Sequence, residues 1–382
     1  MKVMTIFGTR PEGIKMAPVI QALNRDPFIE SVALNTGQHK EMLDQVLELF
    51  QLVPDYNLHI MKNGQTVEEL TSRLIQTVTP IIQKEAPDLV LVHGDTTTTL
   101  VGAYTAFLQK IPVGHVEAGL RTDNKYSPFP EEINRQLVDR LASYHFAATP
   151  SNKQNLIDEK INADHIIVTG NTVIDALLQI TEQPHLFPAA LKKIFKSEKK
   201  TILLTTHRRE NLKDLQYVYR AINRIVKENK DVQVVFPVHK NPKIRATVRA
   251  EIGENENIHL IEPLDYQDFV HVMKQSYLVI TDSGGIQEEA PGLGKPVLVA
   301  RNTTERPEGV EAGTLKLVGT SEEKIYTECT RLLVNETAYK SMAAISNPFG
   351  NGEAAAHIVS CIKNNIFENI SEGMLEETLE RI

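Results

Sequence analysis

The sequence predicts an α/β protein built from two Rossmann-like, doubly wound domains. The chain has 382 residues, which is enough for two domains at roughly 100–200 residues each. Short apolar segments recur along it, and each is followed by a loop and then by a stretch with helical spacing. This βαβ alternation is typical of parallel sheets whose strands are connected by helices.

The first series of expected strands lies in the N-terminal half of the chain. Its apolar segments are at residues 3–7, 32–35, 89–93, 113–116 and 144–148, and residues 166–172 indicate a further strand that ends in a turn. Between them, residues 65–85 place apolar side chains at helical spacing toward a sheet, namely Leu70, Leu74, Val78, Ile81 and Ile82. We therefore expect an N-terminal Rossmann-like domain at residues 1–172.

A second series of strands is expected after the loop at residues 182–188. Its apolar segments are at 201–205, 233–237, 259–261, 278–281 and 296–300, again with helical stretches between them. We place the C-terminal Rossmann-like domain at residues 173–363. The last helix is expected around residues 352–367, and we expect residues 364–382 to form a C-terminal helix or tail that could pack back on the N-terminal domain.

Composition and charge exclude several classes of protein. The formal charge of −8 is spread without a long basic run, so neither a nucleic-acid surface nor an anionic membrane surface is indicated. No stretch approaches the roughly 20 apolar residues of a membrane span, and we expect a cytoplasmic protein. Cys329 and Cys361 are too few for a disulfide framework or a zinc set, and we expect no metal.

The loop after the first strand is a candidate phosphate site. Gly8 ends the strand, and Pro11 can open a helix at its first turn. Arg10 and Lys15 then lie near a helix N-terminus, where backbone N–H groups favour an anion. The alternative is a helix cap with two solvated cations.

Two carboxylates follow expected strands, where the ligand of an open parallel sheet binds, and a third follows a loop. They are Asp95, Glu117 and Glu131, the last of which follows a double-proline loop at residues 126–130 and has Glu132 as its neighbour. Acids that converge at one rim would separate their pKa values and supply both an acid and a base. The alternative is surface capping, and Asp95 in particular could cap the next helix.

Polar groups also follow the strands of the second half. Residues 201–207 lead to His207, Arg208 and Arg209, and the next strand leads to His239. A histidine followed by two guanidinium groups at a strand end indicates an anion contact.

The segment 281–290 carries the most informative motif. Ser283, Gly284 and Gly285 would open a helix whose N–H groups a phosphate can approach closely. Glu289 lies more than one turn further along, where its carboxylate could accept hydrogen bonds from ribose hydroxyls. Arg306 is a further candidate cation. The alternative is a glycine-containing helix start with solvated acids.

These motifs resemble those of the bacterial non-hydrolysing UDP-N-acetylglucosamine 2-epimerases. The resemblance covers nearly the whole chain, in order, at residues 7–12, 92–96, 114–121, 126–132, 207–211, 281–291 and 304–309. It implies a fold like the glycosyltransferase-B type, with a cleft between the two domains, and a homodimer.

The resemblance also implies an activity, the reversible conversion of UDP-GlcNAc to UDP-ManNAc at C2, in the supply of ManNAc for cell-surface polysaccharide. UDP would be expelled to leave 2-acetamidoglucal and then added back, without a metal or another cofactor. The implied catalytic residues are Asp95, Glu117, Glu131 and His207. The implied UDP contacts are Arg10, Lys15, Phe269, Ser283, Gly284, Gly285, Glu289 and Arg306.

Bacterial members of the family also bind a second UDP-GlcNAc molecule as an allosteric effector. By resemblance this site would be lined by Gln38, Glu131, Arg208, Arg209 and His239. The sequence departs from the expected glutamine and arginine at Glu41 and Gly64. Three other functions stay open: a glycosyltransferase of the same fold, a hydrolysing epimerase that releases free ManNAc, and a non-catalytic sugar-nucleotide sensor.

Overall fold

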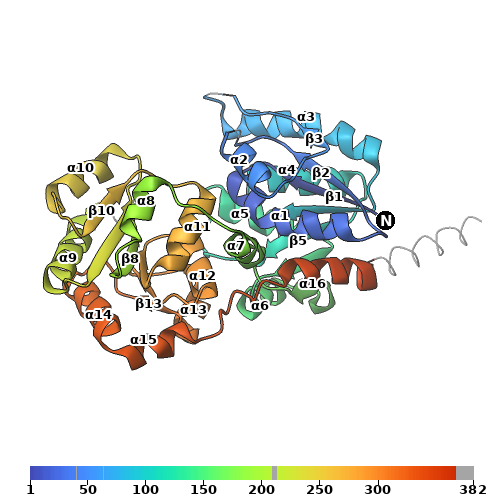
Figure 1. Cartoon of the computed structure of the whole chain (residues 1–382). Coiled ribbons are helices and arrows are strands. Elements are labelled where there is room, and N and C mark those ends of the chain that lie inside the picture. Colours follow the sequence, from blue (N-terminus) through green and yellow to red (C-terminus); the bar gives the residue numbers. More distant parts are fainter. Residues whose placement is uncertain (40, 63, 209–212, 367–382) are drawn as a thin grey trace, which may run out of the picture. The chain divides into compact units, whose positions relative to one another are not determined.

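The structure, a computed structural model, describes residues 1–39, 41–62, 64–208 and 213–366. The chain divides into two compact units, each of which Figure 1 shows in sequence colours. Unit 1 comprises Met1–Ala176 and Gly350–Ile382, and unit 2 comprises Leu177–Phe349. None of the helices in the described ranges combines the length and the apolar composition of a membrane span.

Unit 1 is built on a parallel sheet which, in the described part of the chain, has seven strands in the order β3-β2-β1-β4-β5-β6-β7. The strands are β1 (Lys2–Phe7), β2 (Glu30–Asn35), β3 (Tyr56–Asn57), β4 (Leu89–His93), β5 (Val113–Ala118), β6 (Tyr144–Ala147) and β7 (Ile166–Val168). The helices are α1 (Arg10–Arg25), α2 (Glu41–Leu49), α3 (Val67–Glu85), α4 (Thr97–Leu108), α5 (Glu131–Leu141), α6 (Pro150–Asp158) and α16 (Ala354–Cys361), and α7 (Thr172–Glu182) spans the boundary between the two units. A 3-10 turn (Ala163–His165) and a π turn (Ile362–Ile366) complete the unit.

Helix α3 illustrates how apolar spacing determines packing in unit 1. Its predicted inner face is confirmed, because Leu70, Leu74, Val78 and Ile82 are buried in one core cluster with residues of β1 and β4. Ile81 is only partly buried at the edge of that face. A capping box between Thr66 and Glu69 satisfies backbone N–H groups at the start of the helix.

Unit 2 repeats this architecture with a parallel sheet of six strands among its described residues, in the order β10-β9-β8-β11-β12-β13. The strands are β8 (Lys200–Thr205), β9 (Val232–Pro237), β10 (Ile258–Ile261), β11 (Leu278–Thr281), β12 (Val297–Val299) and β13 (Leu315–Leu317). The helices are α8 (Ala189–Ile194), α9 (Leu215–Glu228), α10 (Pro242–Glu251), α11 (Tyr266–Gln275), α12 (Gly284–Gly292), α13 (Pro307–Ala312), α14 (Glu322–Val334) and α15 (Glu336–Ala343).

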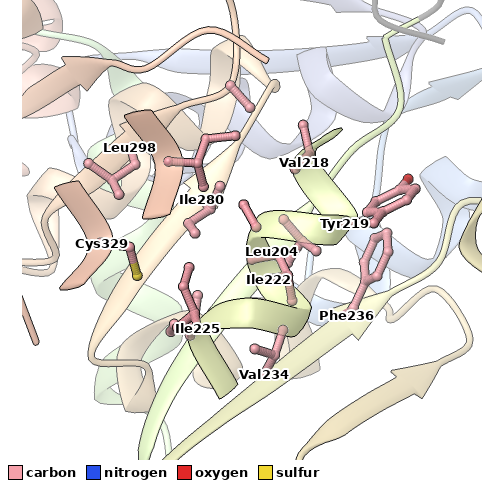
Figure 2. Close-up of a cluster of buried hydrophobic side chains, with 14 of the residues drawn as sticks. Leu204, Val218, Tyr219, Ile222, Ile225, Val234, Phe236, Ile280, Leu298 and Cys329 are labelled. Atoms are coloured by element: carbon pink, nitrogen blue, oxygen red, sulfur yellow. The ribbon is translucent and has the colours of Figure 1, made fainter. Parts of the chain in front are cut away.

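The core of unit 2 lies between α9 and the sheet, and Figure 2 shows part of it. Tyr219 of α9 lies against Phe236 of β9, with ring centroids 5.7 Å apart. Ile222 and Ile225, on the same face of α9, are fully buried with Ile280 of β11. This packing fixes the strands whose carboxyl ends carry the polar groups described below.

The strand pattern predicted from the sequence is confirmed in both units. Each expected segment forms a strand whose ends lie within two residues of the prediction, apart from residues 166–172, whose strand ends at Val168. Two short edge strands, β3 and β13, were not predicted, because neither has the length of an apolar run that identifies a strand.

The segment from Gly350 onward belongs to unit 1, whereas the sequence placed residues up to 363 with the C-terminal domain. Helix α16 packs against α1, as Figure 1 shows. The buried Asp175 carboxylate accepts the backbone N–H groups of Ala354 (3.3 Å) and Ala355 (2.8 Å) at the start of α16. These bonds satisfy two of the N–H groups that a helix start leaves without a partner. Most of the expected tail at 364–382 lies outside the described residues.

Candidate functional site

Unit 1 has a cavity of about 430 Å³ at the carboxyl ends of β1, β4 and β5. The three carboxylates predicted from the sequence all line it: Asp95 after β4, Glu117 on β5 and Glu131 at the start of α5. Lys15 and His93 also line it. The rule that ligands bind beyond the carboxyl ends of parallel strands therefore brought these side chains together correctly.

Glu117 is held in an unusual backbone conformation at this cavity. Its φ angle is +64°, in the left-handed region that non-glycine residues rarely adopt, and the register of β5 against β6 shifts around it. Its carboxylate is hydrogen bonded to the Lys15 ammonium group and accepts a 3.0 Å bond from the Asn171 side chain. Such bulges re-aim a side chain, and this one directs a carboxylate to the cavity.

Gly119 allows the chain to leave this bulge. Its φ angle is +83°, and a Cβ there would lie 2.2 Å from the backbone oxygen of Asn152. Only glycine fits this close approach without moving α6. The glycine of the motif at residues 114–121 therefore has a steric cause.

Asp95 has its own cation. The Arg135 guanidinium group of α5 is hydrogen bonded to its carboxylate, and the Asn134 side chain donates to its backbone oxygen at 2.9 Å. The alternative prediction that Asp95 caps α4 is wrong, because Thr96 is the N-cap and accepts the N–H of Thr99. Separate cations at Asp95 and Glu117 relieve the repulsion expected between these carboxylates.

The structure separates the paired acids at the start of α5. Glu131 is half-buried and lines the cavity, whereas Glu132 is fully buried and does not. The Glu132 carboxylate accepts the Thr122 backbone N–H (3.1 Å) and the Gln136 side-chain N–H (2.9 Å). Glu132 therefore anchors the preceding loop, and Glu131 is the acid that a ligand can meet.

Glu12 is a buried residue of this site that the sequence interpretation missed. Its carboxylate accepts the backbone N–H groups of Gly8 and Thr9 and the hydroxyls of Thr96 and Thr99, at 2.6–2.9 Å. Burial raises the pKa of Glu12, while these hydrogen bonds act in the opposite direction. The Thr-x-x-Glu spacing at Thr9 is a capping-box signal that could have identified it.

A chain of polar groups extends from Gly94, which lines the cavity. The His115 ring has Nε2 at 2.7 Å from the Gly94 carbonyl and Nδ1 at 2.5 Å from the Asp139 carboxylate. Asp139 also accepts a 2.7 Å hydrogen bond from Arg121, which is paired with Glu159. Because the Gly94 carbonyl can only accept, His115 donates to it and fixes the turn that presents Asp95.

The two cations expected at the first loop, Arg10 and Lys15, differ in whether they line the cavity. Lys15 faces the cavity and Glu117, whereas Arg10 is half-buried at the start of α1 and is not part of the lining. Gln38 lines the cavity, and its side-chain oxygen accepts the Thr98 hydroxyl at 2.9 Å.

In unit 2, Asp282 organises the loop after β8. This fully buried carboxylate accepts the backbone N–H groups of His207 and Arg208, both at 2.9 Å, and lies 3.0 Å from His207 Nδ1. The His207 ring stacks on His239, with centroids 6.2 Å apart. Sequence reasoning missed Asp282 because it reads as the end of a strand. Arg209 lies outside the described residues.

Helix α12 opens as predicted, with Ser283 as its N-cap. A Cβ at Gly284 would lie 3.2 Å from the Arg306 guanidinium carbon, so Gly284 admits Arg306 to the helix N-terminus. Arg306 also donates to Glu288 at 2.7 Å. This places a cation beside N–H groups that favour anions.

Further along α12, Glu289 faces helix α11. Its buried carboxylate accepts the Tyr266 hydroxyl at 3.0 Å, a contact the sequence did not indicate. Phe269, one turn after Tyr266 on α11, is half-buried. A ligand that spans this helix start would meet donors at Gly284 and an acceptor at Glu289.

The expected effector residues fall in different units, Gln38 in unit 1 and Arg208 and His239 in unit 2. Gly64 has a φ angle of +74° and an open surrounding. The Glu41 side chain lies outside the part of the chain that the structure describes. In the part of the chain that the structure describes, no group of three or more His, Cys, Asp or Glu could hold a metal ion.

This combination defines a class of protein. Two doubly wound parallel sheets, one with carboxylates and one with a glycine-opened helix beyond its strand ends, are typical of α/β enzymes acting on nucleotide-linked substrates. Comparison with known proteins gives the family. The family model described as UDP-N-acetylglucosamine 2-epimerase matches residues 21–363.

Individual relatives agree with the family model. The chain is 51% identical to the UDP-N-acetylglucosamine 2-epimerase of Escherichia coli K12 over 96% of this chain and 99% of the relative. It is 54% identical to that of Bacillus subtilis 168 over 94% of each. The crystal structure of the Neisseria meningitidis UDP-GlcNAc 2-epimerase, bound to UDP-GlcNAc, has a TM-score of 0.85, 48% identity, and coverage of 96% and 100%. The chain belongs to the UDP-N-acetylglucosamine 2-epimerase family, and the predicted resemblance and glycosyltransferase-B-like fold class are confirmed.

The Asp282 contacts predict a pH-dependent contribution to stability. Burial alone would raise the pKa of Asp282, but the His207 ring and the two backbone N–H groups outweigh it and lower the pKa below the usual aspartate value. The stabilisation is therefore fully present above pH ~4 and is lost as the pH falls through the lower folded-state pKa. Asp282→Asn should reduce the free energy of unfolding by about 1–3 kcal/mol at neutral pH, and by progressively less below pH ~4.

Urea unfolding of the whole chain at several pH values, with hydrogen exchange used to monitor the amides of unit 2, measures this free energy of unfolding. The exposed Asp231→Asn is the control for removing one carboxylate from the unit. Equal pH dependence in the Asp282→Asn variant and the natural chain would contradict the assignment.

Proposed function

We propose that the chain interconverts UDP-GlcNAc and UDP-ManNAc by inverting C2 through elimination and re-addition of UDP. The observation that carries this proposal is the cavity of unit 1, where Glu117 is directed by a left-handed bulge and meets Lys15 and Asn171. Asp95 and Glu131 line the same cavity. Family membership supports the substrate, since relatives carry this activity in their names.

The chemistry explains why acid and base groups are needed. The C2 hydrogen of the sugar is not acidic, so a base cannot remove it directly. If the C1–O bond breaks first, its electron pair leaves with UDP and positive charge on the ring acidifies C2. A carboxylate then takes the C2 proton and leaves 2-acetamidoglucal. Re-addition of the UDP oxygen to C1, with a proton delivered to the opposite face of C2, inverts that centre.

Unit 1 supplies the proton-transfer groups in this proposal. We assign Asp95, Glu117 and Glu131 to proton removal and return, because all three line one cavity. Arg135 is hydrogen bonded to Asp95 and Lys15 to Glu117, and an ionised carboxylate is the form that accepts a proton. Lys15 and Arg10 also supply positive charge toward the diphosphate.

Unit 2 supplies the groups that hold UDP. The N-terminus of α12 at Ser283, Gly284 and Gly285 binds a diphosphate, and Arg306 beside it adds a cation. Glu289 accepts the ribose hydroxyls, and Phe269 packs on the base. His207, oriented by Asp282, completes the catalytic set. Donors fixed in advance stabilise the departing diphosphate better than water does, and they retain it for re-addition.

The three rival functions predict different outcomes when the chain is incubated with UDP-GlcNAc. A hydrolysing epimerase releases free ManNAc and UDP, a glycosyltransferase needs an acceptor, and a sensor changes nothing. Proton NMR of the purified chain with UDP-GlcNAc alone should show a stable mixture of two UDP-sugars. Accumulation of free ManNAc, or an unchanged spectrum, would rule out the proposed reaction.

The division of labour between the units is tested by a pair of variants. Glu117→Gln should lower turnover at least ~100-fold while UDP binds within twofold of normal, because Glu117 is assigned to the sugar and not to UDP. Glu289→Gln should weaken UDP about tenfold, because a neutral amide is a poorer acceptor, while its oxygen can still accept the Tyr266 hydroxyl.

Calorimetry with UDP and turnover with UDP-GlcNAc measure both quantities, with the exposed Glu311→Gln as control. Near-normal turnover of Glu117→Gln would withdraw its catalytic assignment. Unchanged UDP affinity of Glu289→Gln would withdraw the ribose contact.

Assembly and regulation extend the proposal. We infer a homodimer, which is supported by the exposed apolar side chains of α4, namely Tyr104, Phe107 and Leu108. A second UDP-GlcNAc would act as an effector through Gln38, Glu131, Arg208, Arg209 and His239. The product is an activated sugar, so a glycosyltransferase that builds cell-surface polysaccharide is the class of enzyme that consumes it.

A further inference from the structure

His93 is a buried residue of the unit 1 cavity that has no assigned function. It ends β4, two residues before Asp95, is 3% exposed and lines the cavity. Its Nε2 atom lies 3.8 Å from Glu117 Oε2, beyond hydrogen-bonding distance. Among the described residues, this Nε2 has no hydrogen-bond partner. Buried polar atoms are nearly always satisfied, so an orphan at a cavity wall indicates a partner that is not part of the protein.

The charge of His93 is set by its burial. Burial lowers its pKa to about 3, and the opposing effect of the Glu117 carboxylate is too small to restore it. The ring is therefore neutral near neutral pH, and the approach to Glu117 is not an ion pair. A neutral imidazole nitrogen either donates or accepts one hydrogen bond, according to its tautomer.

The surrounding groups indicate what the Nε2 atom meets. Lys15 and Asn171 are both hydrogen bonded to Glu117 Oε2, the oxygen nearest to His93. The histidine therefore flanks the carboxylate that, in the proposed function, exchanges a proton with C2 of the sugar. Apart from the C1 oxygen that leaves with UDP, the substituents nearest to that carbon are the acetamido group on C2 and the hydroxyl on C3.

We propose that His93 is a substrate-contacting residue whose Nε2 forms a hydrogen bond with the acetamido group or the neighbouring hydroxyl of the sugar. This inference rests on the proposed function and deepens it. A neutral ring suits the position, because a second cation beside Glu117, in addition to Lys15, would lower its basicity. His93 thus orients the sugar without weakening the base.

Two substitutions of similar size separate this contact from simple packing. Glutamine places an amide near the position of Nε2, and methionine fills similar volume without a comparable hydrogen-bonding group. His93→Met should lower kcat/KM for UDP-GlcNAc at least about tenfold, and His93→Gln should stay within about threefold of the natural chain. UDP affinity should be unchanged in both variants, because UDP lacks the sugar.

His145 provides the matched control. It is 2% exposed on β6, two strands away from β4 in the same sheet. Its ring nitrogen Nδ1 has no hydrogen-bond partner among the described residues, but His145 is not part of the cavity lining. His145→Gln and His145→Met should change kcat/KM equally, whatever they do to thermal stability. The contact is supported if kcat/KM differs between the glutamine and methionine variants at position 93 but not between those at position 145.

The outcomes also separate this inference from the proposed function. If the natural chain makes UDP-ManNAc but the His93→Met and His93→Gln variants are equally active, the contact is overturned and the function stands. If only His93→Gln folds, His93 satisfies a protein group and the contact is again overturned. If the natural chain does not make UDP-ManNAc, both proposals fail.

Discussion

Glu117 is held in a left-handed backbone conformation at the carboxyl end of β5, and the rest of the unit 1 site is arranged around its carboxylate. A non-glycine residue in this region costs of order 1 kcal/mol or more, so it persists only where neighbouring contacts fix it. Here the Lys15 ammonium group and the Asn171 amide hold the carboxylate, and Gly119 lets the chain turn away. The strain is thus located at the residue for which acid–base chemistry is proposed.

Two polar clusters, one around Glu12 in the cavity wall and one around His115, keep this arrangement rigid. Glu12 joins the loops after β1 and β4 through four hydrogen bonds, and each of its oxygens is satisfied. His115, paired with Asp139, fixes the Gly94 turn through its bond to the Gly94 carbonyl. Breaking one partner of such a buried network leaves the other uncompensated, so these residues are required even without touching a ligand.

Much of the fold and part of the site followed from the sequence for identifiable reasons. Apolar spacing predicted α3 and the strands of both sheets, and the strand-end rule brought Asp95 and Glu117 to one cavity. The left-handed conformation of Glu117 was not predictable, because nothing in its residue type requires it. Its pairing with Lys15 joins residues 102 positions apart, and such contacts depend on the whole fold.

The residues that the sequence interpretation missed differ in whether a sequence pattern could have indicated them. The Thr-x-x-Glu pattern at Thr9 indicates a capping box and would have drawn attention to Glu12. Asp282 had no such signal, because a buried acid at a strand end is recognised only through the loop that it binds. The position of α16 in unit 1 likewise depends on Asp175, which is far away in the sequence.

The central claim is that a carboxylate of this cavity removes the C2 proton and that solvent-exchangeable hydrogen returns. The most direct measurement is turnover of UDP-GlcNAc by the natural chain in D₂O, with the C2 position of the products followed by NMR. The account predicts that UDP-ManNAc forms with deuterium at C2 and that deuterium then enters the UDP-GlcNAc pool. UDP-ManNAc that retains protium at C2 would contradict it.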